Sequence, residues 1–392
     1  MIFTESEEGW FQLPGDRQQE AARLIRDEVR ILLLADSHLG FDLPVRPRVD
    51  RRRRGHDFLA NYAAALRPAL AGEVDVVVHA GDVFDRSRIV PTLAYQAFDP
   101  LCRVADRGIP VFIVPGNHER SRLPHLRFAS HPGVCVFDRP RTFHTEVRGT
   151  TIAIAGFPYE RDVRARFPDL VEQTGWRNCA AALRLLCIHH CVEGATVGPG
   201  NYMFTTAADV VRIREVPSQF AAAFSGHIHR HQVLTTDLSR RPVSSPVLYP
   251  GSLERTTFAE MGEPKGFMIV RLGVDTEAGS ARVTWEFREL PARPMVRAEI
   301  AVEGMSETAL AAAVREIIAA APADAVLSIR LTGALTESHW RAVSSARLRA
   351  MAPSTMNVEI VPVDAWASRR EPTIVSGYEL DPQLPLGPAS SF

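Results

Sequence analysis

Short apolar runs rich in β-branched residues alternate with Ala/Leu/Arg segments of helical period along the first half of the chain. Short continuous apolar runs are typical of buried strands, whereas apolar residues spaced three to four apart are typical of helices. The expected strands are 29–35, 74–80, 109–114, 151–155, 184–188 and 221–225. Helices are expected at 55–70 and 91–107, so the first half reads as a β-α-β-α-β series of the layered α/β class.

The later part of the chain changes in character. Residues 266–272 and 281–287 are expected to form two strands joined by a polar turn. Strand-like and helix-like runs then alternate, which predicts a compact α+β domain. The Pro-, Gly- and Ser-rich end favours a tail without fixed structure. The expected parts are an N-terminal extension at 1–28, a main domain at 29–290, a small domain at 291–365 and a tail at 366–392.

Polar side chains follow five of the expected strands at the point where each strand ends. They are Asp36 and His38, Asp82 and Asp85, Asn117 and His118, His189, and His227 and His229. Ligands of open α/β sheets bind beyond the carboxyl ends of the strands, so these side chains are expected to converge. A lone histidine at a strand end is more often structural, but five such strand ends favour a common site. His190, next to His189, is expected to face the opposite side.

These residue types indicate a catalytic metal site. Carboxylate, carboxamide and imidazole groups without a thiolate suit borderline to hard divalent ions such as manganese, iron or zinc. A closed structural zinc site would favour cysteines instead. Two ions about 3.5–4 Å apart can hold a phosphate, activate water and stabilise the attacking and leaving oxygens of an in-line displacement. The pattern therefore predicts hydrolysis of a phosphate ester.

Composition narrows the possible partners and the compartment. Of the 392 residues, 46% are hydrophobic and 23% are charged. This length and hydrophobic content are enough to form one large core and a second small one. The net charge of −1 gives no global attraction to nucleic acid, so a polyanion site would need local clusters. No apolar run approaches membrane-spanning length, the N-terminus is acidic where a signal peptide is basic, and the five cysteines are an odd number. We therefore expect a cytoplasmic protein with free thiols and no membrane partner.

The order D-x-H, GD-x-x-D, GNH-E, H and GH-x-H resembles the motif series of the calcineurin-like metallophosphoesterase superfamily. Within it, ADSHLG, GDVFD, GHIHR and LYPGSLERTTFAEMGEPKGF are similar to the Mre11 family, which includes the nuclease subunit of the bacterial SbcCD complex. The resemblance covers residues 29–290. It implies a layered metallophosphoesterase β-sandwich flanked by helices, with the small C-terminal α+β domain capping one side of the cleft.

The resemblance also implies a role for each candidate residue and two divalent ions, with Mn²⁺ expected, as cofactors. One ion would be held by Asp36, His38 and His229, the other by Asn117, His189 and His227, with Asp82 bridging them. His118, oriented by Asp85, would be the acid or electrostatic partner at the leaving oxygen. Two features depart from the family pattern: Glu119 replaces the usual Asp, and the tail lacks the amphipathic helices with which some members bind their ATPase.

An arginine-rich loop, RPRVDRRRRG at residues 46–55, follows the D-x-H motif. A charged run before a helix is usually a solvated loop. Because this loop begins where the chain leaves the proposed metal site, phosphate binding is the favoured interpretation. The predicted DNA-binding residues are Arg51, Arg52, Arg53 and Arg54.

Together these features predict a metal-dependent DNA exonuclease of a repair complex. The resemblance implies DNA and an SMC-like ATPase of the SbcC/Rad50 type as partners, and it leaves a homodimer open. A small-molecule phosphoesterase using the same site is the alternative. A non-catalytic scaffold on the same fold is a third interpretation, and it is weak because no ligand position is lost.

Overall fold

The structure is a computed structural model that describes residues 3–6, 9–12, 28–43, 50–274 and 281–363. The chain divides into two compact units. Unit 1 comprises Met1–Leu39, Asn61–Leu253 and Pro264–Leu290, and unit 2 comprises Gly40–Ala60, Glu254–Glu263 and Pro291–Phe392. The tail expected at 366–392 lies outside the described residues, as does most of the extension expected at 1–28.

Unit 1 contains a six-stranded mixed sheet in the order β18-β17-β3-β4-β5-β6. Its strands are β3 (Val29–Leu34), β4 (Val76–His79), β5 (Val111–Ile113), β6 (Val134–Val136), β17 (Gly266–Val274) and β18 (Ala281–Glu289). Strands β3 to β6 are parallel, and the antiparallel pair β17–β18 adds to β3. Because β3, β4 and β5 are parallel, their carboxyl ends meet at one edge of the sheet.

A second mixed sheet of unit 1 has the order β15-β16-β14-β9-β8-β7. Its strands are β7 (Arg141–Val147), β8 (Thr150–Gly156), β9 (Leu183–Ile188), β14 (Ala222–Ser225), β15 (Gln232–Thr236) and β16 (Pro242–Tyr249). The four central strands are parallel, and β7 and β15 are antiparallel to their neighbours at the two edges. The carboxyl ends of β9 and β14 therefore also lie side by side.

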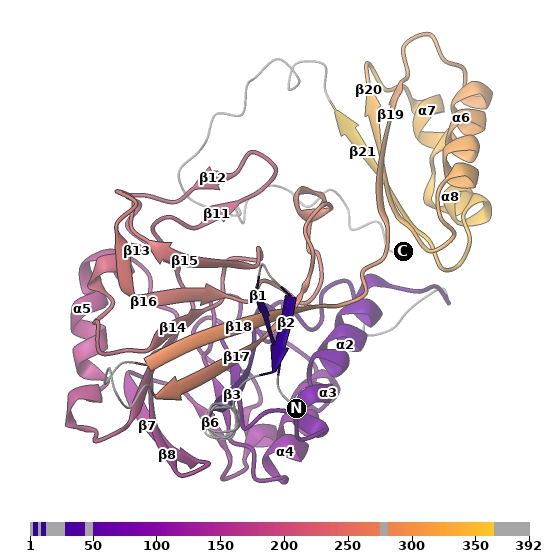
Figure 1. Cartoon of the computed structure of the whole chain (residues 1–392). Coiled ribbons are helices and arrows are strands. Elements are labelled where there is room, and N and C mark those ends of the chain that lie inside the picture. Colours follow the sequence, from indigo (N-terminus) through magenta and orange to yellow (C-terminus); the bar gives the residue numbers. More distant parts are fainter. Residues whose placement is uncertain (1–2, 7–8, 13–27, 44–49, 275–280, 364–392) are drawn as a thin grey trace. The chain divides into compact units, whose positions relative to one another are not determined.

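The two sheets share one apolar core. Inward-facing residues of the first sheet, such as Ile31 and Leu33, belong to the same cluster as Ile154, Leu185 and Phe224 of the second. The other face of the second sheet packs against α5 (Val163–Gln173), which lies beside β14 and β16 in Figure 1. Strands covered on both faces read as unbroken apolar runs, and this explains the pattern of β3, β4 and β9.

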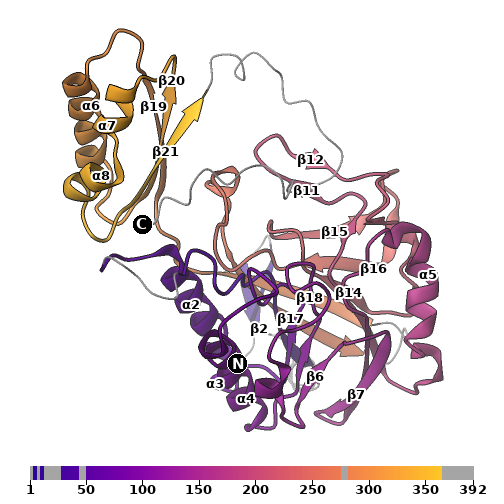
Figure 2. The same ribbon diagram turned by 180° about the vertical axis from the view of Figure 1, so that it is seen from behind.

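Helices α2 (Arg54–Ala65), α3 (Arg67–Leu70) and α4 (Pro91–Ala105) follow β3 and β4 along the chain. The helix expected at 55–70 is interrupted at Leu66, because Pro68 has no N–H to continue the ladder of α2. The Tyr62 hydroxyl donates to the Ala97 carbonyl at 2.8 Å and ties the end of α2 to α4. Figure 2 shows α3 and α4 side by side from behind.

Short strand pairs complete unit 1. They are β1 (Phe3–Ser6) with β2 (Gly9–Gln12), β10 (Cys191–Val192) with β13 (Val210–Val211), and β11 (Thr196–Val197) with β12 (Tyr202–Met203). Its single-turn 3₁₀ helices are Leu126–Ala129, Trp176–Asn178 and Ile213–Glu215.

Unit 2 contains a parallel three-stranded sheet in the order β19-β20-β21. Its elements are β19 (Met295–Ala301), α6 (Glu307–Ala320), β20 (Val326–Thr332), α7 (Glu337–Ala342), α8 (Ser345–Met351), β21 (Asn357–Val363) and the 3₁₀ turn Phe258–Glu260. Leu327 and Ile329 of β20 pack with Leu310 and Val314 of α6 in a core separate from that of unit 1. The Ser306 hydroxyl caps α6 by accepting from the Ala309 N–H.

The expected fold class is confirmed: two mixed sheets flanked by helices, with a small C-terminal sheet. All six strands expected between residues 29 and 225 are present. Strands β7, β15 and β16 were not predicted, because their exposed, polar positions break the apolar pattern. In the part of the chain that the structure describes, no helix has the length and apolar character that a membrane span requires. Capping of the cleft by the C-terminal sheet stays a prediction.

Candidate metal centre

Eight of the nine polar side chains expected to converge meet at one place in unit 1, whereas Asp85 contributes its main-chain carbonyl and not its carboxylate. Asp36 and His38 follow β3, Asp82 follows β4, and Asn117 and His118 follow β5 of the first sheet; His189 follows β9, and His227 and His229 follow β14 of the second. Distances of 3.0–4.0 Å join their polar atoms across the two sheets. The predicted convergence at the strand ends is therefore seen directly in the structure.

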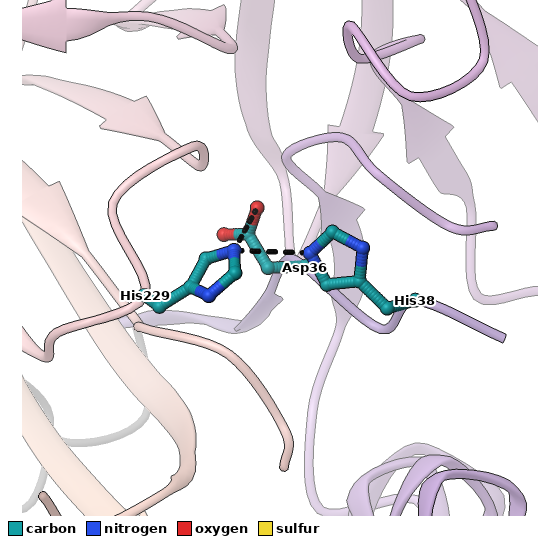
Figure 3. A group of neighbouring side chains, drawn as sticks. All are labelled: Asp36, His38 and His229. Carbon is teal, nitrogen blue, oxygen red and sulfur yellow. Dashed lines mark hydrogen bonds and ion pairs between the residues drawn. The ribbon is translucent and has the colours of Figure 1, made fainter. Parts of the chain in front are cut away.

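Asp36, His38 and His229 form one cluster (Figure 3). The Nε2 atoms of the two imidazoles are 3.0 Å apart, and the His229 Nε2 lies 3.9 Å from Oδ1 of Asp36. The Nδ1 atom of His38 is buried and has no hydrogen-bond partner within the described residues. Three donor atoms thus face a common point, although His229 is 191 positions beyond His38 in the sequence.

Asn117, His189 and His227 form a second cluster. The Asn117 Oδ1 lies 3.1 Å from the His189 Nε2 and 3.0 Å from the His227 Nδ1. The Asp82 Oδ2 is 3.2 Å from the same His189 nitrogen, and Asp82 also groups with His38. Asp82 therefore lies between the two clusters, where a carboxylate that bridges two ions would have to lie.

The backbone at this site adopts conformations that side chains normally avoid. Asp36, His38, Asp82 and His227 have φ angles of 49°, 41°, 52° and 76°, in the left-handed region. Non-glycine residues rarely adopt this region, and such strain collects at functional sites because the surrounding structure must hold it. Four of the seven predicted ligands are thus held in costly conformations.

Close packing also explains the glycine of the GNH motif. A Cβ atom on Gly116 would lie 2.1 Å from Oδ1 and 2.6 Å from the backbone nitrogen of Asp82. A side chain at position 116 would therefore displace Asp82. The motif glycine leaves the space that the central carboxylate needs.

The charges in the site favour cation binding. Burial alone would raise the pKa of Asp82, but the charge of His189 and its hydrogen bond outweigh burial and hold this pKa well below its usual range. Burial alone would lower the pKa of His189, yet Asp82 and Asp36 raise it to about 9. Burial lowers the pKa of His227 to about 3 and that of His38 well below its usual value, so both imidazoles are neutral donors.

Main-chain groups orient the ligand side chains. The Nδ1 of His189 is 2.7 Å from the Ala80 carbonyl, to which it can donate, and this leaves Nε2 for a ligand. The His227 N–H donates to the Asp36 carboxylate at 3.0 Å. Partners of this kind fix the tautomer and direction of metal-binding imidazoles.

His118 lies at the accessible side of the site, with a third of its side chain exposed. Its Nδ1 is 2.7 Å from the main-chain carbonyl of Asp85, so the group of Asp85 that orients it is the carbonyl. The carboxylate of Asp85 instead pairs with Arg86 at 3.0 Å. The His118 Nε2 lies 4.0 Å from Asp82.

The residues present fit a pair of divalent ions. Three groups each bring their ligand atoms within 4.8 Å of one another: Asp36, His38 and His229; His38, Asp82 and His118; and Asp36, Asp82 and His189. No group found in the described residues contains a cysteine. Oxygen and imidazole donors without sulfur match borderline to hard divalent ions. The clusters are consistent with a dimetal site.

The model of the family described as calcineurin-like phosphoesterase matches residues 29–231, more than half of the chain. The chain belongs to the calcineurin-like phosphoesterase family. Among its distant relatives are two archaeal proteins named DNA double-strand break repair protein Mre11. The one from Methanosarcina acetivorans is 27% identical over 62% of this chain and 37% of its own length. The one from Aeropyrum pernix is 25% identical over 69% of this chain and 63% of its own length.

The chain therefore spans less than two thirds of the length of either relative. A solved structure of a dimetal phosphatase from Danio rerio is 13% identical, with a TM-score of 0.38, and covers 65% of this chain and 98% of that one. So weak a likeness adds nothing to the family assignment, which rests on the matched residues.

Two buried residues that support this phosphoesterase site were missed in the sequence. The Glu119 carboxylate accepts from the N–H groups of Phe84 and Gly116, both at 2.7 Å, and so joins the two loops that carry Asp82 and Asn117. Burial, together with the charge of Asp82, raises the pKa of Glu119 to about 8. Its position after GNH was the signal that could have indicated this role.

The other missed residue is His79, at the end of β4. Its Nε2 is 2.7 Å from the hydroxyl of Ser37, the residue between Asp36 and His38. Burial lowers the pKa of His79 to about 3. His190 is also buried; its Nε2 meets the main chain of Glu160, its ring stacks on Tyr159, and it is in none of the three groups of ligand atoms found in the described residues.

The four arginines predicted to bind DNA belong to unit 2 and have partners within it. Arg51 donates to the carbonyls of Ala352 and Pro353, both at 2.7 Å. Arg52 pairs with Asp57, Arg53 with Asp42, and Arg54 with the Arg255 carbonyl and Glu254. Arg54 is buried against Phe41 and Phe58, whereas the other three remain partly exposed. DNA binding by these residues stays a prediction.

Proposed function

We propose that this phosphoesterase is a two-metal phosphodiesterase that hydrolyses DNA, acting as the nuclease subunit of a repair complex. The observation that carries the proposal is the convergence of all seven candidate ligands at the strand ends of two sheets. In this proposal Asp36, His38 and His229 hold one ion, Asn117, His189 and His227 hold the other, and Asp82 bridges them. The distances that join each set of donor atoms support this division.

Two divalent ions bound here would polarise a phosphate and lower the pKa of a water, with Mn²⁺ as the expected ion. The protein residues do the rest. The neutral imidazoles of His38 and His227 offer lone pairs, and the Asp82 carboxylate stays ionised between the two clusters.

His118 supplies the proton at the leaving oxygen in this proposal. Because its Nδ1 donates to the Asp85 carbonyl, its Nε2 is the atom left to hold and deliver a proton. Its partial exposure allows it to reach a bound substrate. Asp85 acts only by holding this ring in place.

DNA is the proposed substrate because the distant relatives carry the name of a DNA double-strand break repair protein. Partly exposed guanidinium groups of Arg51, Arg52 and Arg53 could bind phosphates by exchanging their present partners. The resemblance to the Mre11 family further supports an SMC-like ATPase of the SbcC/Rad50 type as partner. A homodimer is compatible with the same proposal.

A small-molecule phosphoesterase is the second candidate, and two observations favour it. All four loop arginines already have partners within unit 2, and the net charge of −1 gives no general attraction to DNA. A non-catalytic scaffold is less well supported, because every ligand position carries a side chain that can bind a metal.

The deciding experiment is digestion of end-labelled single- and double-stranded DNA with and without Mn²⁺, beside bis(4-nitrophenyl) phosphate. Asp82→Asn is the inactive control. Mn²⁺-dependent cleavage of DNA that the control lacks supports the nuclease. Turnover of the small diester without any cleavage of DNA would support the small-molecule enzyme instead. Absence of turnover on both substrates with two ions bound would favour the scaffold.

A further inference from the structure

Lys265 is the only lysine among the 45 lysine and arginine residues of the chain. It directly precedes β17, and its side chain is only 1% exposed. Removing an ammonium from water is costly unless hydrogen bonds or charges compensate for the lost hydration. A surface role, in which arginine would serve equally well, is therefore excluded.

The ammonium of Lys265 donates to the main-chain carbonyl of His229, with 2.8 Å between nitrogen and oxygen. The same carbonyl accepts from the N–H of Ser252 at 3.1 Å. Gly251, with a φ of +78°, makes this approach possible, since a Cβ there would lie 2.8 Å from the His229 oxygen and from the nitrogen of His231. The main-chain carbonyl of a proposed ion ligand thus accepts from two donors, the Lys265 ammonium and the Ser252 N–H.

Ser252 connects this segment to a second proposed ligand. It forms a parallel bridge with Ala35, the residue before Asp36, and its carbonyl accepts from the N–H of Gly266 at 3.3 Å. Figure 3 shows the imidazole of His229 facing both the Asp36 carboxylate and His38. Lys265 and Ser252 therefore act on the backbone that carries two of these three side chains.

We propose that Lys265 is a positioning residue for the ion held by Asp36, His38 and His229. Its ammonium fixes the peptide group after His229, so that the imidazole stays directed at the other two ligands. The inference rests on the proposed two-ion site. A compact ammonium can reach a carbonyl in a buried space, whereas a planar guanidinium needs room for a fork of five donors. This difference explains why the one lysine of the chain lies here.

Loss of the ammonium has two effects of opposite sign on ion binding. Its positive charge repels a nearby divalent ion, so removing the charge alone would tighten binding. Its hydrogen bond orders a ligand, so removing the bond would weaken binding. The positioning role requires the second effect to dominate. Partners of this kind typically change metal affinity by about 10–100-fold.

The test compares Lys265→Met, which keeps an unbranched apolar stem without the ammonium, with the parent chain. Mn²⁺ is titrated calorimetrically into metal-free protein, and the EPR signal of two exchange-coupled Mn²⁺ ions is recorded. Ser245→Ala is the matched control, because the buried Ser245 hydroxyl also donates to main-chain carbonyls of unit 1, those of Pro217 and Phe220. Thermal unfolding of each metal-free variant measures any general loss of stability.

Lys265→Met is expected to bind one ion like the parent and the other about 10–100-fold more weakly, with loss of the coupled EPR signal near two equivalents of Mn²⁺. Ser245→Ala is expected to bind both ions like the parent. Added propylammonium, but not propanol, should restore part of the Mn²⁺ affinity that Lys265→Ala loses. Lys265→Ala also replaces Lys265→Met in the test if the methionine variant does not fold.

The failures of the two proposals can be told apart. Unchanged or tighter binding of both ions by the Lys265 variants, with two ions bound by the parent, overturns the positioning role and leaves the proposed function intact. A parent chain that binds fewer than two ions overturns the two-ion site and the positioning role together.

Discussion

The Nε2 atom of His189 lies 3.2 Å from Oδ2 of Asp82, and both side chains are buried. In the metal-free chain this is an ion pair, because the His189 pKa is raised to about 9 while that of Asp82 is held low. A proton on His189 therefore balances the buried carboxylate. A divalent ion bound to the same two atoms would take over that role, so proton and metal compete for one position.

This competition predicts that Mn²⁺ binding releases about one proton at a pH near 7.5. Below a pH of about 9 His189 is protonated, and only the neutral imidazole can bind a metal. Affinity should therefore rise about tenfold per pH unit and level off above the His189 pKa. Calorimetric titration in buffers of different ionisation enthalpy measures the released proton. An affinity that does not change between about pH 6.5 and 8.5 would count against His189 as a ligand.

Asp82→Asn is expected to weaken the binding of both ions and to abolish turnover without unfolding the chain. The Asn side chain keeps the shape of Asp82. Its amide oxygen can still accept from the main-chain N–H of His118, as Oδ1 of Asp82 does at 3.0 Å. His189 then loses its ion pair with Asp82, but it can lose its proton and so avoid a poorly compensated buried charge. Calorimetry and thermal unfolding report the two effects separately.

The control for this variant is Asp106→Asn, since the exposed Asp106 pairs with His131 on the surface and should affect neither measurement. Full activity of Asp82→Asn with two ions still bound would refute the assignment of Asp82 as the bridge.

His118→Ala is expected to keep both ions and to lose about 10²–10⁴-fold in turnover, the usual contribution of a general acid. The accessible ring and its bond to the Asp85 carbonyl favour a role toward substrate. His125→Ala is the control, because the His125 ring meets only the Ile89 carbonyl among the hydrogen bonds described. Loss of an ion from His118→Ala would make His118 a ligand, a role that its grouping with His38 and Asp82 permits.

Gly116→Ala should weaken ion binding without removing any charge. The new methyl group would meet the carboxylate and the backbone nitrogen of Asp82 at 2.1 and 2.6 Å, so Asp82 must move. Gly200→Ala is the matched control, since a Cβ there has no neighbour within 4 Å among the described atoms. The measurement is the Mn²⁺ affinity of the two variants. Equal affinities would show that the site tolerates a shift of Asp82.

The strand ends of this fold were predictable because two independent patterns coincide there. The apolar run of β3 ends at a carboxylate and an imidazole, and the runs of β4, β5, β9 and β14 end in the same chemistry. Because the carboxyl ends of parallel strands lie along one edge of the sheet, local sequence patterns were enough to predict that these residues lie close together. That His38 faces His229, 191 residues away, followed only from resemblance to a family.

The supporting residues could not be predicted from local pattern. Glu119, His79 and Lys265 each make a buried hydrogen bond to a backbone or side-chain group that is distant in sequence, and burial strengthens these bonds. A charged residue looks the same in sequence whether it is solvated or buried. The edge strands β7 and β15 were missed for the related reason that exposed strands lack an apolar run.

The arginine-rich loop shows the same limit, because its partners are distant in sequence. Arg51 bonds to carbonyls about 300 positions further along the chain, and the Arg52 N–H donates to the Ser354 carbonyl at 3.1 Å. These bonds give the loop a structural role within unit 2 as an alternative to DNA binding. Arg54, which is buried, belongs to the structural role and is left unchanged in the test that follows.

Replacing Arg51, Arg52 and Arg53 together with Gln distinguishes the two roles of the loop. If these side chains contact phosphates, a plot of the logarithm of the duplex association constant against the logarithm of the salt concentration should have a slope of about −0.9 per contact. The triple variant should flatten that slope. The loss should be independent of sequence, since phosphate contacts do not read bases. Turnover of bis(4-nitrophenyl) phosphate should stay unchanged.

The control removes the same charge from exposed surface arginines, namely Arg139, Arg166 and Arg177. If the triple variant has a lower melting temperature but an unchanged salt slope, the loop only stabilises unit 2. The small-molecule phosphoesterase would then be the better supported function.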